Sequence, residues 1–313
     1  MRVITAKDVL GRITVAELVP VMEAAMKDIS AGEALHPPRF VVPINEAGRM
    51  GMMYGALHNP PLHGAKVLSL YPDAPRHGLS SHQGFVLLFE SEHGRPVAAI
   101  EADALTALRT AAVSMLATCR LGRADPRIFT ICGAGEQAEY HLRGALECFD
   151  PSEIRIWARR PEAARDLADR FPDAPVPVRV CTSLVEAITG ADVITTATAA
   201  RSAFLAGADL EPGQHLNLVG ASLADMREVD DTAVARMLMF TDSLDSSSRE
   251  SGEIMEARAA GAIDAAYQVT ELGAVLAGAA TGRTSATQIT GYKSHGLIVQ
   301  DLAAAWHIAQ TLA

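Results

Sequence analysis

Residues 127–148 read RIFTICGAGEQAEYHLRGALEC and carry the strongest structural signal in the chain. The first six residues are typical of a buried strand, and apolar residues recur at helical spacing from residue 137 onward. Between them lies a G-x-G-x-x-A pattern formed by Gly133, Gly135 and Ala138. Such a turn lets the backbone approach a pyrophosphate, with the helix N-terminus facing the phosphates. The segment therefore predicts a dinucleotide-binding fold.

The sequence around this turn alternates short apolar runs with helical patterns. Strands are predicted at residues 127–132, 153–157, 179–181, 192–196, 215–219 and 237–241, with helices at 137–148, 161–170 and 184–189. Strands separated by helices of this length indicate a parallel sheet covered on both faces. The middle of the chain is thus expected to be a doubly wound α/β domain of the Rossmann type.

The two flanks have a different pattern. Helices are predicted at residues 15–31, 103–121 and 294–312, and strand-like pieces at 40–43, 50–57 and 84–90. We expect the apolar C-terminal helix to return to the N-terminal part. The predicted fold class is therefore α/β, with a Rossmann domain at residues 118–293. A smaller α+β domain, built from both chain ends, takes residues 1–117 with 294–313.

Charge and composition exclude several classes of protein. The formal net charge is -10, which argues against a nucleic-acid partner, because such a surface needs a basic stripe. No apolar run reaches the length of a membrane span, and the charged N-terminus does not resemble a signal peptide. The four cysteines form no C-x-x-C pair and no histidine cluster accompanies them. A cytoplasmic protein with no membrane contact and no metal site is expected.

The end of the second predicted strand bears on the choice of cofactor. NAD sites usually carry an acid there that binds the ribose 2′-hydroxyl, whereas this chain has Ala158, Arg159 and Arg160. Because guanidinium groups suit a 2′-phosphate, NADP(H) is favoured and NAD(H) remains possible. The alternative is that both arginines are solvated surface residues.

The chain resembles the ornithine cyclodeaminase/μ-crystallin family over nearly its whole length. The matching segments include PPRFVV around Arg39, GAKVLSLYP around Lys66, the RTAA segment at Arg109, CGAGEQA, and TGYKSHG near the C-terminus. The resemblance implies a homodimer formed through the smaller domain, which also lines the substrate site. It further implies hydride transfer at the α-carbon of a small amino acid or cyclic imine.

Site residues follow from the same resemblance. Arg39 and Lys66 match the substrate-binding and catalytic pair, and His295 matches a position beside the substrate. Their chemistry agrees, because a guanidinium can hold a carboxylate and a buried lysine can exchange a proton with an imine nitrogen. Cofactor-contacting positions are matched by Ser81, Arg109, Glu136, Gln137, Arg159, Thr198, Val219, Gly220, Ala221, Ser222 and Ser294.

One position departs from the cyclodeaminase pattern. Cyclodeaminases carry an aspartate where this chain has Ser222, and the nearby Asp225 is expected to be a loop residue. The leading hypothesis is therefore an NAD(P)H-dependent oxidoreductase acting on the C–N bond of a small α-imino or α-amino acid, such as pyrroline-2-carboxylate. The alternatives are an ornithine cyclodeaminase and a non-catalytic, μ-crystallin-like protein that binds NADPH and a small ligand.

Overall fold

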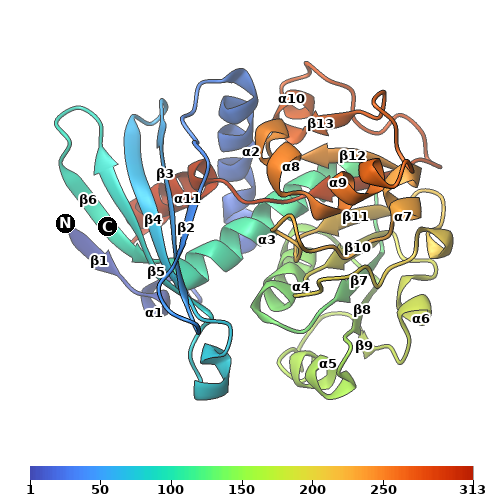
Figure 1. Cartoon of the computed structure of the whole chain (residues 1–313). Coiled ribbons are helices and arrows are strands. Elements are labelled where there is room, and N and C mark those ends of the chain that lie inside the picture. The colour runs from blue at the N-terminus through green and yellow to red at the C-terminus, as the bar shows by residue number, and fades with distance from the viewer. Residues whose placement is uncertain (313) are drawn as a thin grey trace. The chain divides into compact units, whose positions relative to one another are not determined.

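A computed structural model describes residues 1–312, apart from the side chain of Pro75. The chain divides into two compact units. The first unit contains Met1–Thr110 together with the C-terminal segment from Gly296, and the second contains Ala111–His295. Both chain ends thus belong to the first unit (Figure 1).

The first unit is built around a six-stranded sheet of order β1-β6-β5-β4-β3-β2. Strands β1 and β6 run parallel, and the other neighbouring pairs are antiparallel. The strands are β1 (Arg2–Ile4), β2 (Phe40–Pro43), β3 (Arg49–Leu57), β4 (Leu62–Leu70), β5 (His82–Glu90) and β6 (Pro96–Glu101).

The unit contains the long helices α2 (Val15–Ala31) and α11 (Ile298–Thr311), together with the short helix α1 (Ala6–Val9) and the 3-10 turn η1 (Ala74–His77) between β4 and β5. Helix α11 packs on α2, β3, β4 and β5. Strand β4 alternates so that Leu62, Gly64 and Lys66 lie on its buried face. The alternation therefore places a lysine among core residues.

The second unit contains a fully parallel sheet of eight strands, in the order β13-β12-β14-β11-β10-β7-β8-β9. The chain runs from β7 outward through β8 and β9, and then reverses through β10 and β11. The strands are β7 (Ile128–Cys132), β8 (Glu153–Trp157), β9 (Val178–Val180), β10 (Val193–Thr196), β11 (His215–Leu218), β12 (Met237–Thr241), β13 (Val269–Glu271) and β14 (Ile289–Lys293). The reversal between β7 and β10 is the switch point where ligands bind in doubly wound sheets.

The helices of the second unit lie on both faces of its sheet. They are α4 (Glu136–Cys148), α5 (Pro161–Ala168), α6 (Leu184–Ile188), α7 (Asp231–Arg236), α8 (Leu244–Glu250), α9 (Gly252–Ala259) and α10 (Leu272–Leu276), with the 3-10 turn η2 (Gly207–Asp209). One core joins α4 and α5 to residues such as Phe129 and Ile131, and a second joins α6, α7 and α9 to Ile194 and Leu216. Helix α3 (Ala102–Leu121) contains the boundary between the two units.

The predicted fold class is confirmed, with differences in detail. Strand β14 was not predicted, yet it lies between β11 and β12 with all five residues buried. Its mixed sequence, ITGYK, lacks an apolar pattern. The C-terminal helix begins at Ile298 rather than at residue 294, because Gly296 adopts a left-handed φ of 74° that a helix does not tolerate.

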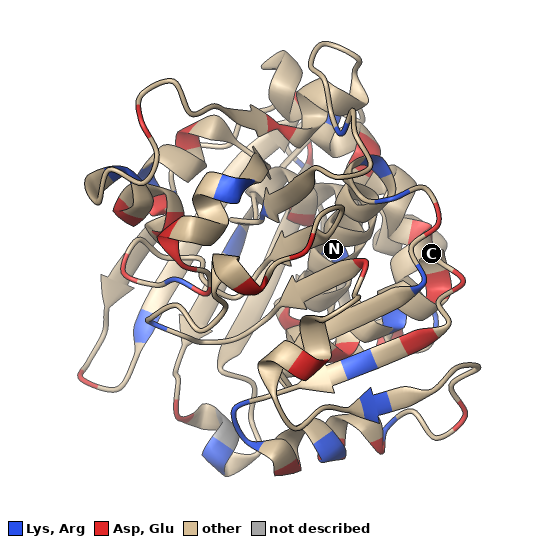
Figure 2. Ribbon diagram, turned by 90° about the vertical axis from the view of Figure 1, so that its right-hand side faces the viewer, with Lys and Arg blue, Asp and Glu red and all other residues tan. Residues whose placement is uncertain are grey.

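Figure 2 shows Lys and Arg residues interspersed with Asp and Glu residues over the ribbon. Within the part of the chain that the structure describes, no helix is both long and apolar enough to cross a membrane.

Candidate functional site

The glycine turn follows β7 at the switch point of the second sheet. Gly133 has a φ of 141°, and a Cβ atom there would lie 2.4 Å from the carbonyl oxygen of Ala197, in the loop after β10. Gly135 is the N-cap of α4, has no side-chain cap, and faces open space. Ala138 is fully buried beneath the turn. The arrangement leaves the first amides of a 13-residue helix free of side-chain caps, as a phosphate site requires.

The residues beside the glycine turn also fit a ligand that contains phosphate. Glu136 begins α4 and is exposed. The side-chain Oε1 of Gln137 is buried and has no hydrogen-bond partner among the described residues. Buried polar atoms are normally satisfied, so an acceptor without a partner beside the glycine turn indicates a ligand position. The residues present therefore fit a dinucleotide.

Arg159 and Arg160 lie at the carboxyl end of β8. Both are exposed, and Arg160 is the N-cap of α5. Neither forms an ion pair with any residue that the structure describes. Both guanidinium groups are thus available to an anion from solvent.

The loops after β10 and β11 contain the other predicted cofactor residues of the second unit. The backbone amide of Thr198 and its Oγ1 donate to the buried Glu228, at 2.8 and 2.7 Å. The amide of Gly220, within the predicted segment from Val219 to Ser222, also donates to Glu228, at 2.8 Å. Ser294 donates from its amide to the carbonyl oxygen of Leu218 at 3.1 Å. The structure therefore brings Thr198, the segment 219–222 and Ser294 to neighbouring strand ends.

His295 ends the second unit, directly after Ser294. Its amide donates to Oδ2 of Asp242 at 2.9 Å, and its residue surface is only 4% exposed. The predicted place of this histidine beside the substrate stays a prediction.

The first unit contains a cluster of buried charges around Lys66. Its Nζ donates to Oδ1 of Asp301 at 3.0 Å and to Oγ1 of Thr106 at 2.7 Å. Arg109 donates from Nε to the same Asp301 oxygen at 2.9 Å, and from Nη1 to Gln300 at 2.9 Å. Lys66 is 2% exposed, Arg109 is 5% exposed and Asp301 is fully buried. Strand β4, helix α3 and helix α11 thus meet at one carboxylate.

The cluster sets the protonation of its members. Burial lowers the pKa of Lys66 to about 8, although Asp301 acts in the opposite direction. Burial acts to raise the pKa of Asp301, but Arg109 and Lys66 outweigh it and the pKa is lowered. Asp301 is therefore ionised at neutral pH, while Lys66 carries a proton that it can release near neutrality.

Arg39 and Ser81 complete the predicted residues of the first unit. Arg39 is half-buried just before β2, and its charge is close enough to contribute to the lowered pKa of Lys66. Oγ of Ser81 lies 2.9 Å from Nδ1 of its neighbour His82. Arg109 lies in the cluster with Lys66, and its predicted contact with the cofactor stays a prediction.

Asp301 and Glu228 were not predicted as site residues. Each is a buried acid, Asp301 in a helix whose other buried residues are mostly apolar and Glu228 in the loop before α7. A lone acid on an apolar helix face is a signal for a buried cation, but the sequence does not say which cation.

A glycine turn at the switch point of a parallel sheet defines a dinucleotide-binding protein of the Rossmann class. The chain belongs to the ornithine cyclodeaminase/mu-crystallin family, whose pattern matches residues 1–313. It is 36% identical to the ketimine reductase mu-crystallin of Mus musculus over 294 residues, covering 92% of this chain and 90% of that protein.

Two solved structures are similar over nearly the whole chain. One is the Δ1-pyrroline-2-carboxylate reductase of Thermococcus litoralis in complex with NADH and L-proline, with a TM-score of 0.94 and 30% identity, covering 99% of this chain and 97% of that one. The other is an archaeal alanine dehydrogenase dimer with bound NAD, with a TM-score of 0.91 and 28% identity, covering 99% and 95%.

Proposed function

We propose that this protein is an NAD(P)H-dependent oxidoreductase that reduces the C=N bond of a small α-imino acid, with cyclic ketimines such as pyrroline-2-carboxylate as the substrate class. The observation that carries the proposal is the buried Lys66 ammonium, held by Asp301 and Thr106 in the unit that also contains Arg39. Relatives named as ketimine and pyrroline-2-carboxylate reductases support it.

The cofactor would be held by the second unit. The amides at the start of α4, after Gly133 and Gly135, have no side-chain cap and suit the pyrophosphate. Arg159 and Arg160 suit a 2′-phosphate, and Thr198 with the segment 219–222 and Ser294 would contact the remainder. When bound, the reduced nicotinamide supplies a hydride equivalent to the imine carbon. NADP(H) is the proposed preference, with NAD(H) as the other possibility.

Residues of the first unit act on the substrate. The Arg39 guanidinium binds the α-carboxylate through two parallel hydrogen bonds. Lys66 gives its proton to the imine nitrogen as the carbon is reduced, so the product is the amino acid and Lys66 becomes a neutral amine. Burial, which lowers the pKa of Lys66, favours that neutral form. Asp301 fixes the position of Nζ throughout.

The position of Asp225 argues against the cyclodeaminase alternative. Ser222 replaces the aspartate of cyclodeaminases, and Asp225 is the nearest acid in the sequence. It lies in a turn, is paired with Arg201 at 2.7 Å, and its side chain is 62% exposed. An exposed, paired carboxylate is a poor substitute for a catalytic acid.

The proposed reaction is tested by turnover with the purified protein. Pyrroline-2-carboxylate and NADPH should give proline, followed as loss of absorbance by the reduced cofactor. Ornithine should release no ammonia, with or without added NAD. Rapid ammonia release would establish the cyclodeaminase function instead, and tight NADPH binding without turnover of any cyclic imine would establish a binding protein.

Substitutions at Lys66 and Arg39 should separate their roles. Lys66→Ala is expected to lower kcat by about 10²- to 10⁴-fold, the usual effect of losing a positioned general acid. Arg39→Ala should mainly raise KM, because a carboxylate clamp binds ground and transition states alike. In the unmutated protein, kcat should fall as pH rises through about 8, as Lys66 loses its proton. The control is Lys27→Ala, which removes a partly exposed lysine paired with Glu23.

Cofactor preference depends on the two arginines after β8. NADPH should bind roughly 10- to 100-fold more tightly than NADH, because charge-assisted bonds to phosphate contribute about 1.5–3 kcal/mol. The difference should shrink at high salt and disappear in the double variant Arg159→Ala, Arg160→Ala. The control is Arg165→Ala, an exposed arginine on α5. Calorimetric titration that shows equal affinities, or tighter NADH, contradicts the preference.

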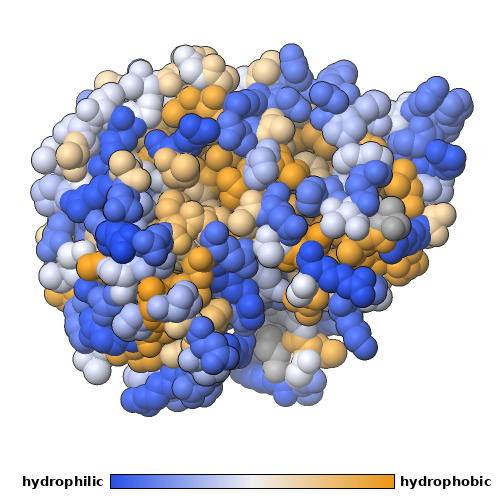
Figure 3. Space-filling view, turned by 180° about the vertical axis from the view of Figure 1, so that it is seen from behind, coloured by the Kyte–Doolittle hydropathy of each residue, from blue (hydrophilic) through white to orange (hydrophobic). Residues whose placement is uncertain are grey.

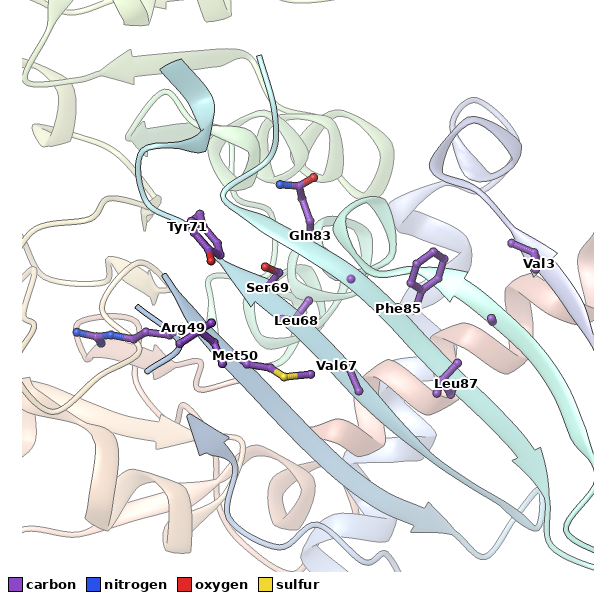
Figure 4. A pocket seen from close by; sticks show the side chains of 13 residues that line it. Val3, Arg49, Met50, Val67, Leu68, Ser69, Tyr71, Gln83, Phe85 and Leu87 are labelled. Carbon is purple, nitrogen blue, oxygen red and sulfur yellow. The ribbon is translucent and has the colours of Figure 1, made fainter. Parts of the chain in front are cut away.

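An open apolar face on the first unit supports a homodimer. Figure 3 shows apolar side chains at the surface among hydrophilic ones. A depression of about 660 Å³ lies over strands β3, β4 and β5, with Met50, Val67, Phe85 and Leu87 along it (Figure 4). Val42 on the neighbouring β2 is 55% exposed. Exposed apolar patches of this kind mark interaction sites, and the similar alanine dehydrogenase is a dimer.

Sedimentation tests the dimer. The protein should sediment at twice its chain mass of 33.1 kDa at micromolar concentration. Val42→Asp should give the monomer, because a charge would be buried in the interface. Val185→Asp should stay dimeric, since Val185 is equally exposed at 52% but lies on α6 of the second unit. A monomeric unmutated protein refutes the proposed assembly.

A further inference from the structure

We infer that Glu228 is a positioning residue that holds the loops after β10 and β11 in the form that binds the nicotinamide mononucleotide half of the cofactor. The inference rests on the proposed function and deepens it, because it names what shapes one half of the dinucleotide site. Glu228 itself need not contact the cofactor.

One fully buried carboxylate connects both loops. Oε1 of Glu228 accepts from the amide of Thr198 at 2.8 Å and from its Oγ1 at 2.7 Å. Oε2 accepts from Oγ1 of Thr196 at 2.7 Å, from the amide of Gly220 at 2.8 Å, and from that of Ala221 at 3.3 Å. The two loops thus share one carboxylate as hydrogen-bond acceptor. A shift of either loop relative to the other would break hydrogen bonds to Glu228.

All five of these partners donate a hydrogen to the carboxylate. An ionised carboxylate accepts only, and it can accept several hydrogen bonds at once. A glutamine of the same shape would place an NH₂ group against donors on one side. The geometry therefore requires a charged acceptor and not merely a side chain of that size.

The loops after β10 and β11 approach each other too closely for any residue larger than glycine at position 220. A Cβ atom at Gly220 would lie 2.1 Å from the carbonyl oxygen of Thr198 and 2.4 Å from its amide nitrogen. A glutamine at position 228 would leave the amide on one side of this contact, that of Thr198 or that of Gly220, facing an NH₂ group instead of an acceptor. Because unsatisfied buried donors are costly, we expect the loops to separate.

A buried ion pair between Lys293 of β14 and Glu253 also supports the loop after β11. Nζ of Lys293 lies 3.1 Å from Oε1 of Glu253, and both side chains are fully buried. Lys293 also donates to the carbonyl oxygen of Ala221, and Glu253 accepts from the amide of Glu228 at 3.3 Å. The amides of residues 220 and 221 are therefore bound by Glu228, and the carbonyl oxygen of residue 221 is bound by Lys293.

The place of these loops in the sheet assigns them to one half of the cofactor. Doubly wound sheets consist of two mononucleotide-binding halves on either side of the switch point. The glycine turn and Arg159 belong to the half formed by β7, β8 and β9. Glu228 serves the other half, at the carboxyl ends of β10 and β11. Its loss should weaken the nicotinamide half and spare the adenosine half.

Calorimetric titration of the full-length protein tests this assignment. The probes are NADPH with its fragment 2′,5′-ADP, and NADH with its fragment ADP. Glu228→Gln should weaken the binding of both dinucleotides, roughly 10- to 100-fold for the loss of a charged acceptor, while both fragments bind as to the unmutated protein. Glu228→Asp should restore part of the affinity.

The matched control is Glu211→Gln. Glu211 accepts from the amide of Gly190 at 2.8 Å and so joins the segments that precede β10 and β11, at the opposite edge of the sheet. It should leave all four affinities unchanged. Equal weakening of dinucleotides and fragments by Glu228→Gln would show a merely structural role and overturn the inference. So would unchanged binding of both.

A second variant keeps the test valid if Glu228→Gln does not fold. Thr196→Val removes one donor to Glu228 with little change in shape, and should weaken the dinucleotides by roughly 3- to 10-fold without affecting the fragments. Unchanged dinucleotide binding would overturn the inference. Failure of the unmutated protein to bind either dinucleotide would instead refute the proposed function.

Discussion

A carboxylate buried away from water must be matched by cations or hydrogen-bond donors, and in the first unit this requirement falls on Asp301. Its Oδ1 accepts from both Lys66 and Arg109, which come from a strand and a different helix. Lys66 and Asp301 are 235 residues apart in the sequence. The same contact therefore connects the C-terminal helix to the sheet and positions the proposed proton donor.

In the second unit the buried acid Glu228 is also matched by partners, but these partners are of another kind. Glu228 is matched by backbone amides and hydroxyl groups rather than by cations. The Glu253–Lys293 pair lies next to it and holds the same loop. Buried charge is costly in proteins, and Asp301 and Glu228 each lie next to residues that the family resemblance assigns to a ligand. These buried charges thus lie where the backbone of a proposed ligand site has to be held in place.

These clusters also account for the chemistry proposed for the site. In an open position Lys66 would stay protonated far above neutral pH, and in a purely apolar one it would lose its proton. Burial lowers its pKa to about 8 while Asp301 opposes that effect. The ammonium is therefore present at neutral pH and can still be given up. An imine reductase needs such a proton at nitrogen when the carbon is reduced.

The sequence by itself determined the Rossmann fold class, because the glycine turn at Gly133 and the alternation of strands and helices depend on local spacing. It also pointed to Arg39 and Lys66, through segments that resemble a known family. It did not reveal strand β14, whose five residues have no periodic pattern. Nor did it pair Asp301 with Lys66 or Glu228 with two separate loops. Those contacts join segments far apart in the chain, and only the tertiary structure decides which buried charge meets which partner.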